Sequence, residues 1–456
     1  MKHKFLFILL FSLVLEGMVA TQAVAGDYVH QVNTLIGTKG TGLTSGYLYP
    51  GATYPYGMVQ FTPSYFSKRS GFVINQLSGG GCEHMGNFPT FPVKGKLKMS
   101  PDNILNYRIS VSEEKGHAGY YEAMVQEDIK AKLTVTERTG MASYEYPADQ
   151  QYGTIIIGGG ISATPIEQAA IVITAPNKCE GYAEGGNFCG LRTPYKVYFV
   201  AEFDTDALET GTWKREELMP NTTFAEGEYS GVYFTFDVNK KKNIQYKIGV
   251  SYVSVENARE NLKAENAGWD FQKIQNQAEA KWNHYLGMIE VEGTNPDRTI
   301  QFYTHLYRSF IHPNVCSDVN GEYMGADFRV HKSRSKHYTS FSNWDTYRTQ
   351  IQLLSMLDPE VASDIVISHQ LFAEQSGGSF PRWVMANIET GVMQGDPTPI
   401  LIANAYAFGA RNYDPKPIFK IMRKGAEEPG SKSQGVETRP GLKQYLDKGY
   451  YNASIQ

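Results

Sequence analysis

Short segments of alternating or continuous apolar residues dominate the chain from about residue 26 to residue 255. Gly, Asn and Pro residues separate them at turn-like intervals, and no helical spacing of apolar residues intervenes. Many short strands without helices between them are typical of a large antiparallel β-sandwich. The pattern therefore predicts a sandwich over residues 26–255, with its clearest strands at 57–63, 130–147, 153–159, 169–175, 195–203, 231–238 and 244–255.

The pattern changes near residue 256, where apolar residues begin to recur at helical spacing. Residues 256–296 are rich in Ala, Glu and Lys and predict a helical linker. Residues 297–456 predict a helical domain, in which Asp297 is placed to cap the first helix and Pro313 to mark its end. The predicted fold class is α+β, with helices expected at 297–312, 343–357, 359–375, 397–409 and 415–427.

The first 25 residues have the order of a secretory signal peptide. A basic start precedes the apolar run of residues 5–15, and the small residues "AVA" follow at 23–25. The run is too short to cross a membrane comfortably, and no later segment is a candidate membrane span. We therefore predict cleavage near Ala25, export to the periplasm or the extracellular space, and no transmembrane anchor.

The net charge of −4 and the lack of a basic block argue against nucleic acid as a partner. Aromatic residues make up 13% of the chain, with 30 Tyr among them. Tyrosine-rich surfaces suit polar ligands with flat apolar faces, and sugars are such ligands. Tyr is also common in β-strands, and composition alone favours that second explanation.

The four cysteines, Cys82, Cys179, Cys189 and Cys316, lack the clustering of a zinc site. In an exported protein, Cys179 and Cys189 could form a disulfide across a short loop. Buried free thiols are an equally good explanation for all four residues. The sequence leaves the two alternatives open.

Several longer stretches combine glycine, aromatic and acidic residues in a characteristic order. They run from "VNTLIGTKGTG" (32–42) and "YPGATYPYGMVQFTP" (49–63), through "LSGGGCEHMGNFP" (77–89), "GHAGYYEAMV" (116–125) and "YKVYFVAEFD" (195–204), to "LYRSFIHPNVCSDVNGEYMG" (306–325), "SFSNWDTYRTQ" (340–350), "GGSFPRWVMANIETGVMQGDP" (377–397) and "GLKQYLDKGYY" (441–451). In this order, along nearly the whole mature chain, they resemble glycoside hydrolase family 92, whose members are exo-acting α-mannosidases.

The resemblance implies a β-sandwich, a helical linker and an (α/α)6 toroid, with the active site between sandwich and toroid. It also implies calcium-dependent hydrolysis with inversion at the anomeric carbon. The expected partners are α-mannoside oligosaccharides or glycoproteins, such as N-glycan or yeast-mannan chains, and an α1,2-mannosidase type is the first expectation. Inverting glycosidases use a carboxylic acid and a carboxylate base about 6.5–9.5 Å apart. A Ca²⁺ ion accepts oxygen ligands, sugar hydroxyls among them, in a flexible shell.

In "SNWDTYR" the resemblance implies that Asp345 contacts the non-reducing end of mannose, since a carboxylate accepts hydrogen bonds from adjacent hydroxyls. The alternative is an acid favoured by the dipole at a helix N-terminus and paired with Arg348 at i+3. Trp344 either stacks on a sugar or packs in the core. Arg348 either orients Asp345 or binds a hydroxyl, and orientation is the better expectation.

The segment "NIETGVMQGDP" supplies the site candidates Asn387, Glu389 and Asp396. We expect it to form a loop between helices, where toroids present their sites. Turn and helix-cap roles are the alternatives, and Asp396 before Pro397 fits a helix start well. Asn387 is the weakest of the three candidates.

The glycine-rich segment "LSGGGCEHMGNFP" supplies Gly81, Cys82 and His84. The family inserts this loop from the sandwich into the site, and glycines let a backbone approach a ligand closely. The histidines that the family usually carries just before this loop are replaced here by "GFVINQ", which bears on linkage specificity. A structural role is the main alternative for His84.

The family's motifs for the catalytic acid, the catalytic base and the calcium-binding stretch do not occur in these 456 residues. We therefore expect a partial toroid, no catalytic residue and no assigned metal ligand within this sequence, and no activity of this chain alone. The alternative function, from a different class, is a non-catalytic mannose- or glycan-binding protein on the same scaffold.

Overall fold

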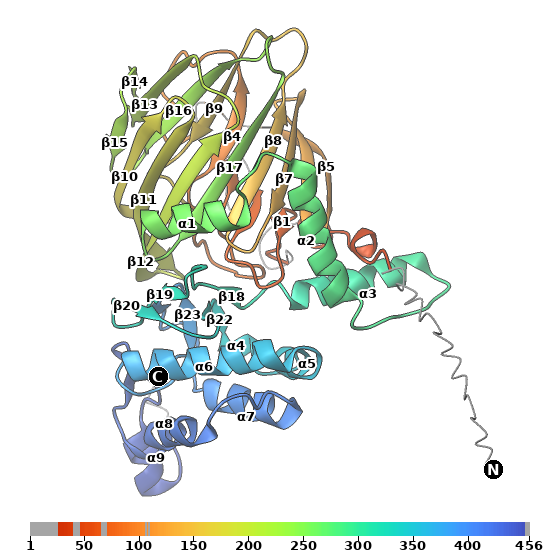
Figure 1. The fold of residues 1–456 in the computed structure, drawn as a ribbon. Helices are drawn as coiled ribbons and strands as arrows, with labels where there is room; N and C mark the ends of the chain where they lie inside the picture. Colours follow the sequence, from red (N-terminus) through yellow and green to blue (C-terminus); the bar gives the residue numbers. More distant parts are fainter. Residues whose placement is uncertain (1–25, 40–45, 65–70, 105–106, 108–109, 452–456) are drawn as a thin grey trace, which may run out of the picture.

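The computed structural model describes residues 26–39, 46–64, 71–104, 107 and 110–451. The predicted signal peptide, residues 1–25, lies outside the described residues. A β-sandwich forms one half of the molecule, and a layered group of helices forms the other (Figure 1). In the part of the chain that the structure describes, no helix combines the length and the apolar character needed to cross a membrane.

Two antiparallel sheets form the sandwich, as the sequence predicts. Within the described ranges the first sheet has the order β1-β2-β3-β4-β9-β16-β13-β14, formed by β1 (Ala52–Thr53), β2 (Gln60–Pro63), β3 (Phe72–Val73), β4 (Thr90–Lys94), β9 (Tyr152–Ile157), β16 (Ser230–Asp237), β13 (Glu209–Lys214) and β14 (Glu217–Pro220). The second has the order β15-β10-β11-β12-β17-β8-β7-β6-β5, formed by β15 (Phe224–Glu226), β10 (Ile166–Ala175), β11 (Lys178–Phe188), β12 (Leu191–Phe203), β17 (Asn243–Ser251), β8 (Thr139–Glu145), β7 (Ile129–Val135), β6 (Tyr120–Val125) and β5 (Val111–His117).

The main hydrophobic core lies between the two sheets. In β12, the alternate residues Tyr195, Val197 and Phe199 are at most 2% exposed, while the residues between them are partly exposed. This alternation is the period of two expected for a strand with one buried face. The helix α1 (Val255–Glu265) covers part of the other face by packing against β12 and β17.

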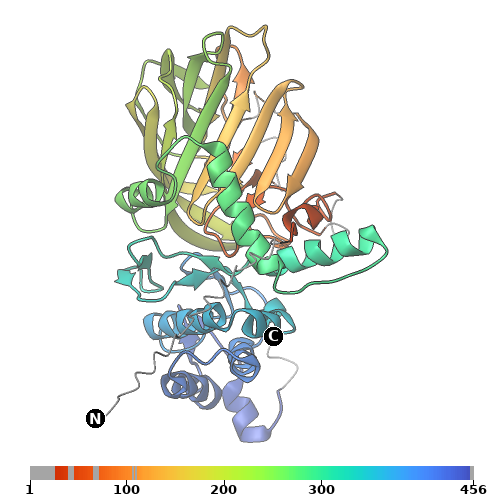
Figure 2. The ribbon, with the colours of Figure 1, turned by 45° about the vertical axis from the view of Figure 1, so that its right-hand side comes forward.

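Two helices follow α1 and lead to the second half of the molecule. α2 (Phe271–Leu286) runs along the sandwich, and α3 (Pro296–Ser309) continues from its lower end (Figure 2). The cap predicted for α3 is wrong by two residues. Asn295, not Asp297, accepts hydrogen bonds from the backbone N–H groups of the first turn, because Pro296 begins the helix.

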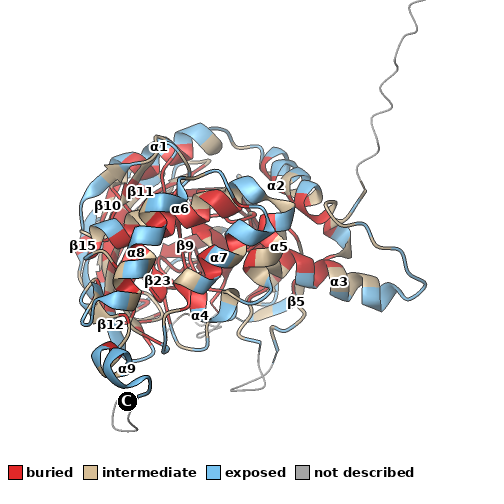
Figure 3. Cartoon of the chain, turned by 90° about the horizontal axis from the view of Figure 1, so that it is seen from below, coloured by how far each residue is buried: buried red, intermediate tan, exposed pale blue. Residues whose placement is uncertain are grey.

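The remaining chain forms short hairpins and a layered set of helices. The strands are β18 (Asn314–Val315), β19 (Glu322–Met324), β20 (Val330–Lys332), β21 (Tyr338–Thr339), β22 (Phe341–Ser342), β23 (Trp383–Met385), β24 (Ile388–Glu389), β25 (Lys432–Ser433) and β26 (Val436–Glu437). The helices are α4 (Asn343–Thr346), α5 (Gln350–Leu357), α6 (Pro359–Gln375), α7 (Thr398–Phe408), α8 (Pro415–Glu427) and α9 (Leu442–Lys448). α5 packs against α6 and α7, and α6 packs against α7 and α8. Seen from below, α6 is largely buried, whereas α8 and α9 carry broad exposed surfaces (Figure 3). A toroidal arrangement stays a prediction.

The pairing of Cys179 with Cys189, one of the two alternatives that the sequence leaves open, is wrong. The structure joins Cys82 to Cys189, and it leaves Cys179 and Cys316 as buried free thiols. The segment between Cys179 and Cys189 is the strand β11 and not a short loop. A strand rises roughly 3.3 Å per residue. The two ends of β11 therefore lie too far apart for those two sulfur atoms to meet.

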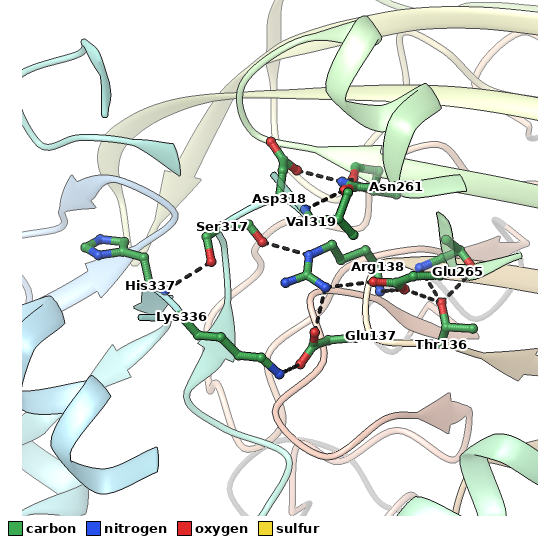
Figure 4. A network of polar contacts seen from close by, with 12 residues as sticks. Thr136, Glu137, Arg138, Asn261, Glu265, Ser317, Asp318, Val319, Lys336 and His337 are labelled. Atoms are coloured by element: carbon green, nitrogen blue, oxygen red, sulfur yellow. Dashed lines mark hydrogen bonds and ion pairs between the residues drawn. The ribbon is translucent and has the colours of Figure 1, made fainter. Parts of the chain in front are cut away.

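A buried arginine joins the sandwich, the linker and the helical half (Figure 4). Arg138 is 6% exposed, and its guanidinium donates to Glu137 at 2.6 Å, to Glu265 on α1 at 2.7 Å and to the carbonyl of Ser317 at 2.7 Å. Lys336 adds an ion pair to Glu137 from the helical half. One cation therefore connects three segments that are distant in the sequence.

A second buried group lies beside this arginine. The carboxylate of Asp318 accepts hydrogen bonds from Ser251 at the end of β17 and from Asn257 and Asn261 on α1. Burial raises the pKa of Asp318, and the three hydrogen bonds oppose that rise. Because its donors come from sandwich and linker while Asp318 belongs to the helical half, this group holds the same junction.

Substitution of Arg138 by Met should lower the free energy of unfolding by about 3 kcal/mol, because it leaves the partly buried Glu265 carboxylate without a cation and removes one of the two cations paired with Glu137. Chemical denaturation measures this change. Lys336→Met is the matched control, since the Lys336 side chain is half exposed and its ion pair should contribute less than about 1 kcal/mol. Equal effects of the two substitutions would contradict the role assigned to Arg138.

His337 at the same junction should make stability depend on pH. Its ring stacks on Tyr323 with 3.7 Å between centroids, and burial lowers its pKa to about 3. An unfolded chain binds the proton at a pKa of about 6.5. Stability is therefore unaffected above that pH, and it falls by up to about 1.4 kcal/mol per pH unit between 6.5 and 3.

The variant His337→Phe keeps the stack and removes the titrating group. Its free energy of unfolding, measured by denaturation from pH 7 to pH 4, should therefore fall less steeply than that of the unmodified protein. Parallel curves would show that His337 does not titrate at a lowered pKa.

Candidate functional site

A cavity of about 580 Å³ lies where the loops of the sandwich meet the helices. Its volume is in the range of small-molecule binding sites. The sandwich supplies Tyr47, Leu77, Ser78, Gly79, Gly80, Gly81, Cys82, Phe188 and Cys189. The helical half supplies Arg308, His312, Pro313, Ser340, Phe341, Ser342, Asn343, Asp345, Thr346, Gln350, Ile351, Leu354, Ile365, His369, Trp383, Met393 and Leu401. Both halves of the molecule are therefore needed to form it.

Asp345 is the single carboxylate among the described residues that line the cavity. It lies on α4 and is exposed, and the Ser342 hydroxyl donates a hydrogen bond to its Oδ2. Within the described chain, its Oδ1 has no hydrogen-bond partner. A carboxylate offers about four acceptor positions, so Asp345 retains acceptor capacity toward a ligand.

The short helix that carries Asp345 is held by its first residue. Asn343 is 1% exposed, and its amide donates to the Thr398 hydroxyl at 2.7 Å and to the Pro381 carbonyl at 3.3 Å. Thr398 begins α7, and Pro381 precedes β23. α4 is therefore fixed to two neighbouring elements, which limits the positions open to the Asp345 side chain.

The sequence predicts one helix over 343–357, but the structure has two, α4 and α5. Thr349 separates them with φ 63° and ψ −46°. The N–H of Gln350 donates to the carbonyl of Arg348 at 2.8 Å, which closes a strained γ-turn. Such a conformation costs a β-branched residue about 1–3 kcal/mol. The turn lets α4 take its own direction beside the cavity.

The expected roles of two neighbours of Asp345 need correction. Arg348 donates to the Tyr347 hydroxyl at 2.7 Å, and among the described contacts it forms no ion pair with Asp345. Neither the orienting role nor the i+3 pair is therefore present. Trp344 is 46% exposed, so it does not pack in the core, and it does not line the cavity. Stacking of Trp344 on a sugar stays a prediction.

The glycine-rich loop forms one wall of the cavity, and Gly81 and Cys82 both belong to that wall. His84 does not. It is completely buried, where its Nε2 accepts from the Leu77 N–H at 2.8 Å and its Nδ1 donates to the Cys82 carbonyl at 2.6 Å. Burial lowers its pKa to about 4, so the imidazole stays neutral. His84 therefore supports the loop from the side away from the cavity. This is the structural role that the sequence leaves as its main alternative.

Asn387 and Glu389 lie on the hairpin β23–β24 and away from the cavity lining. The Asn387 amide donates to the Gly325 carbonyl at 3.1 Å. The buried Glu389 carboxylate accepts the backbone N–H groups of Arg382, Trp383 and Gly391. Burial raises the pKa of Glu389, and these three donors oppose that rise. Glu389 therefore holds the hairpin by accepting its backbone N–H groups, whereas Asn387 joins the hairpin to the β19–β20 turn by donating to Gly325.

Asp396 also lies outside the cavity lining. Its carboxylate is largely buried and pairs with Arg439 at 2.9 Å. Burial raises its pKa, and Arg439 opposes that rise. The helix-cap alternative is wrong as well, since no side chain caps α7. Asp396 therefore ties the start of α7 to the segment before α9.

The described residues offer no group of three or more His, Cys, Asp or Glu side chains that could hold a metal ion. These residues therefore provide no ligand set for the calcium ion that the family resemblance implies.

Two sequence profiles match this chain in succession. The profile described as glycosyl hydrolase family 92 N-terminal domain matches residues 31–251, and that described as glycosyl hydrolase family 92 catalytic domain matches residues 257–456. The chain belongs to glycosyl hydrolase family 92. The two profiles divide this family 92 chain between the end of β17 and the body of α1.

Individual relatives agree with the family. An uncharacterized secreted glycosidase of Arthroderma benhamiae is 25% identical over 489 residues, which cover 97% of this chain and 58% of the relative. A family GH92 α-mannosidase of Bacteroides thetaiotaomicron has a similar solved structure, with a TM-score of 0.82, 25% identity, and coverage of 92% of this chain and 58% of that one. A family GH92 inverting mannosidase of the same organism, at 24% identity and a TM-score of 0.82, shares the fold over 94% of this chain and 59% of its own. This family 92 chain spans about 58% of the length of the first two relatives.

Most residues that line the cavity are not among the predicted site residues, and two aromatic ones stand out. The rings of Phe188 and Trp383 lie 4.5 Å apart between centroids, and each comes from a different half of the molecule. Trp383 lies in the stretch "PRWVMANIE", in which residue type favours the carboxylate and amide side chains as sugar ligands. Phe188 ends β11, a glycine-containing strand that the apolar pattern did not reveal.

The structural role of Glu389 leads to a prediction. The substitution Glu389→Gln should lower the free energy of unfolding by about 2 kcal/mol, because an NH₂ group would face a buried backbone donor. Thermal and chemical denaturation measure the loss. Glu374→Gln on the exposed face of α6 is the control and should change stability by less than about 0.5 kcal/mol. An unaltered stability of Glu389→Gln would remove the role assigned to this carboxylate.

Proposed function

We propose that this family 92 protein is a glycosidase of the α-mannosidase type and that its cavity binds the non-reducing mannose unit of an α-mannoside. The observation that carries the proposal is the position of Asp345, an exposed carboxylate in a cavity formed by both halves of the molecule. The solved relatives described as α-mannosidases, one of them in complex with mannoimidazole, support the choice of sugar.

Asp345 would hold the sugar by accepting hydrogen bonds from two adjacent hydroxyls. Its Oδ1 and the remaining lone pair of Oδ2 are the acceptors, while Ser342 fixes the rotation of the carboxylate. Hydrogen bonds to an ionised group are about twice as strong as neutral ones. The rings of Phe188 and Trp383 add an apolar surface to the same cavity, which suits the C–H face of a pyranose.

The described lining supports sugar binding more directly than it supports hydrolysis. Inversion needs an acid and a base about 6.5–9.5 Å apart, whereas the described lining contains one carboxylate. We therefore assign neither an acid nor a base to the residues described. The same observation favours a second candidate function, a non-catalytic mannose- or glycan-binding protein.

Finer features of the function rest on the resemblance. N-glycan or yeast-mannan chains are the proposed natural ligands, and the α1,2-linked mannobiose is the first linkage to test. Calcium dependence belongs to the same group of proposals. Export, to the periplasm or the extracellular space, is supported by the relative described as a secreted glycosidase.

Asp345→Asn should weaken the binding of methyl α-mannoside at least tenfold, because a hydrogen bond to a charged group contributes about 1.5–3 kcal/mol. Isothermal titration calorimetry measures the affinity. The control is Glu360→Gln, an exposed carboxylate on α6 that does not line the cavity, and its affinity should be unaltered. If Asp345→Asn binds as tightly as the unmodified protein, Asp345 does not hold the sugar.

A hydrolysis assay separates the two candidate functions. Purified protein is incubated with an aryl α-mannoside and with α1,2-mannobiose, in calcium and in EDTA. Release of mannose supports the glycosidase, and binding without release supports the glycan-binding protein. If the protein neither binds the mannosides nor releases mannose from them, both candidate functions are refuted.

A further inference from the structure

Two consecutive backbone N–H groups at the start of the glycine-rich loop donate to histidines from different halves of the molecule. The Leu77 N–H donates to Nε2 of His84, within the same loop, at 2.8 Å. The next residue, Ser78, donates its N–H to Nε2 of His312 at 2.8 Å. His312 follows α3 in the helical half, so this second hydrogen bond crosses from one half to the other.

The orientation and the tautomer of His312 are fixed by Asn314. The Asn314 amide donates to the carbonyls of Gly57 at 2.8 Å and Ile311 at 3.0 Å, which leaves its Oδ1 facing the imidazole. Nδ1 of His312 therefore carries the proton and donates to this Oδ1 at 2.7 Å. Nε2 is left as an acceptor, and the ring cannot turn without losing both contacts.

The loop depends on such external contacts because its own sequence gives it little rigidity. Glycine loses more conformational freedom on folding than any other residue, and three consecutive glycines follow Ser78. Gly79 has φ +86°, and a Cβ at Gly80 would lie 2.8 Å from the His84 ring, so neither position accepts a stiffer residue easily. The Cys82–Cys189 disulfide fixes the far end of the wall.

We propose that His312 is a positioning residue of the sugar site, whose Nε2 holds the Ser78 amide and thereby fixes the glycine-rich wall, residues 78–82, against the helical half of the cavity. The effect on sugar binding rests on the proposed function. The effect on the loop does not. His312 and Ser78 both line the cavity, so the hydrogen bond is located where the two walls meet. The other contacts described near this end, from the Leu77 N–H to His84 and from the Gly79 N–H to the Tyr47 carbonyl, stay within the sandwich.

Two substitutions at His312 test the proposal. His312→Leu removes the acceptor, whereas His312→Gln offers an amide oxygen near the position of Nε2. His305→Gln, at an exposed histidine on α3, is the matched control. Hydrogen–deuterium exchange of a peptide that contains residues 77–82 reports on the loop in the full-length protein, and calorimetry with methyl α-mannoside reports on the site.

We expect His312→Leu to accelerate exchange in this peptide at least fivefold and to weaken methyl α-mannoside binding about tenfold. His312→Gln should restore most of both properties, and His305→Gln should alter neither. Unchanged exchange in His312→Leu would overturn the proposal, and so would a Gln variant as disturbed as the Leu variant. If the unmodified protein does not bind the mannoside, the proposed function fails, while the exchange data still decide whether His312 holds the loop.

Discussion

The buried guanidinium of Arg138 joins the two halves of the molecule from which the cavity takes its walls. A charge so deeply buried persists only if its hydrogen bonds are satisfied by fixed partners, and here the partners are Glu137, Glu265 and the Ser317 carbonyl. These three belong to the sandwich, to α1 and to the helical half. Because the cavity takes its walls from both halves, a contact that fixes their relative position also fixes the shape of the cavity.

The sequence predicts regular elements well where a local signal agrees with the tertiary packing. The predicted helices at 359–375 and 415–427 agree with α6 and α8 because each begins with Pro after a capping Asp, Asp358 or Asp414. The pattern fails at Thr349, where helical spacing continues through a backbone break that only a strained φ angle reveals. It also misses β11, whose glycines dilute the apolar alternation.

The candidate site was harder to predict than the fold, because residue type does not reveal a residue's partner. Asp345 and Glu389 are both acids in shared motifs, but one faces the cavity and the other is surrounded by backbone donors. Cys189 has its partner on a loop 107 residues away, and only the meeting of the β11–β12 turn with the glycine-rich loop brings them together. Phe188 and Trp383 meet for a similar tertiary reason.

The wall formed by Gly79, Gly80 and Gly81 has a consequence for how specificity can change. A ligand beside these residues meets main-chain atoms and not side chains, so there is little for a point substitution to alter without disturbing the backbone. Adding or removing loop residues would reshape the wall, within limits set by its two fixed ends. Divergence of sugar preference on this scaffold should therefore leave its record in the length of this loop more than in its residue types.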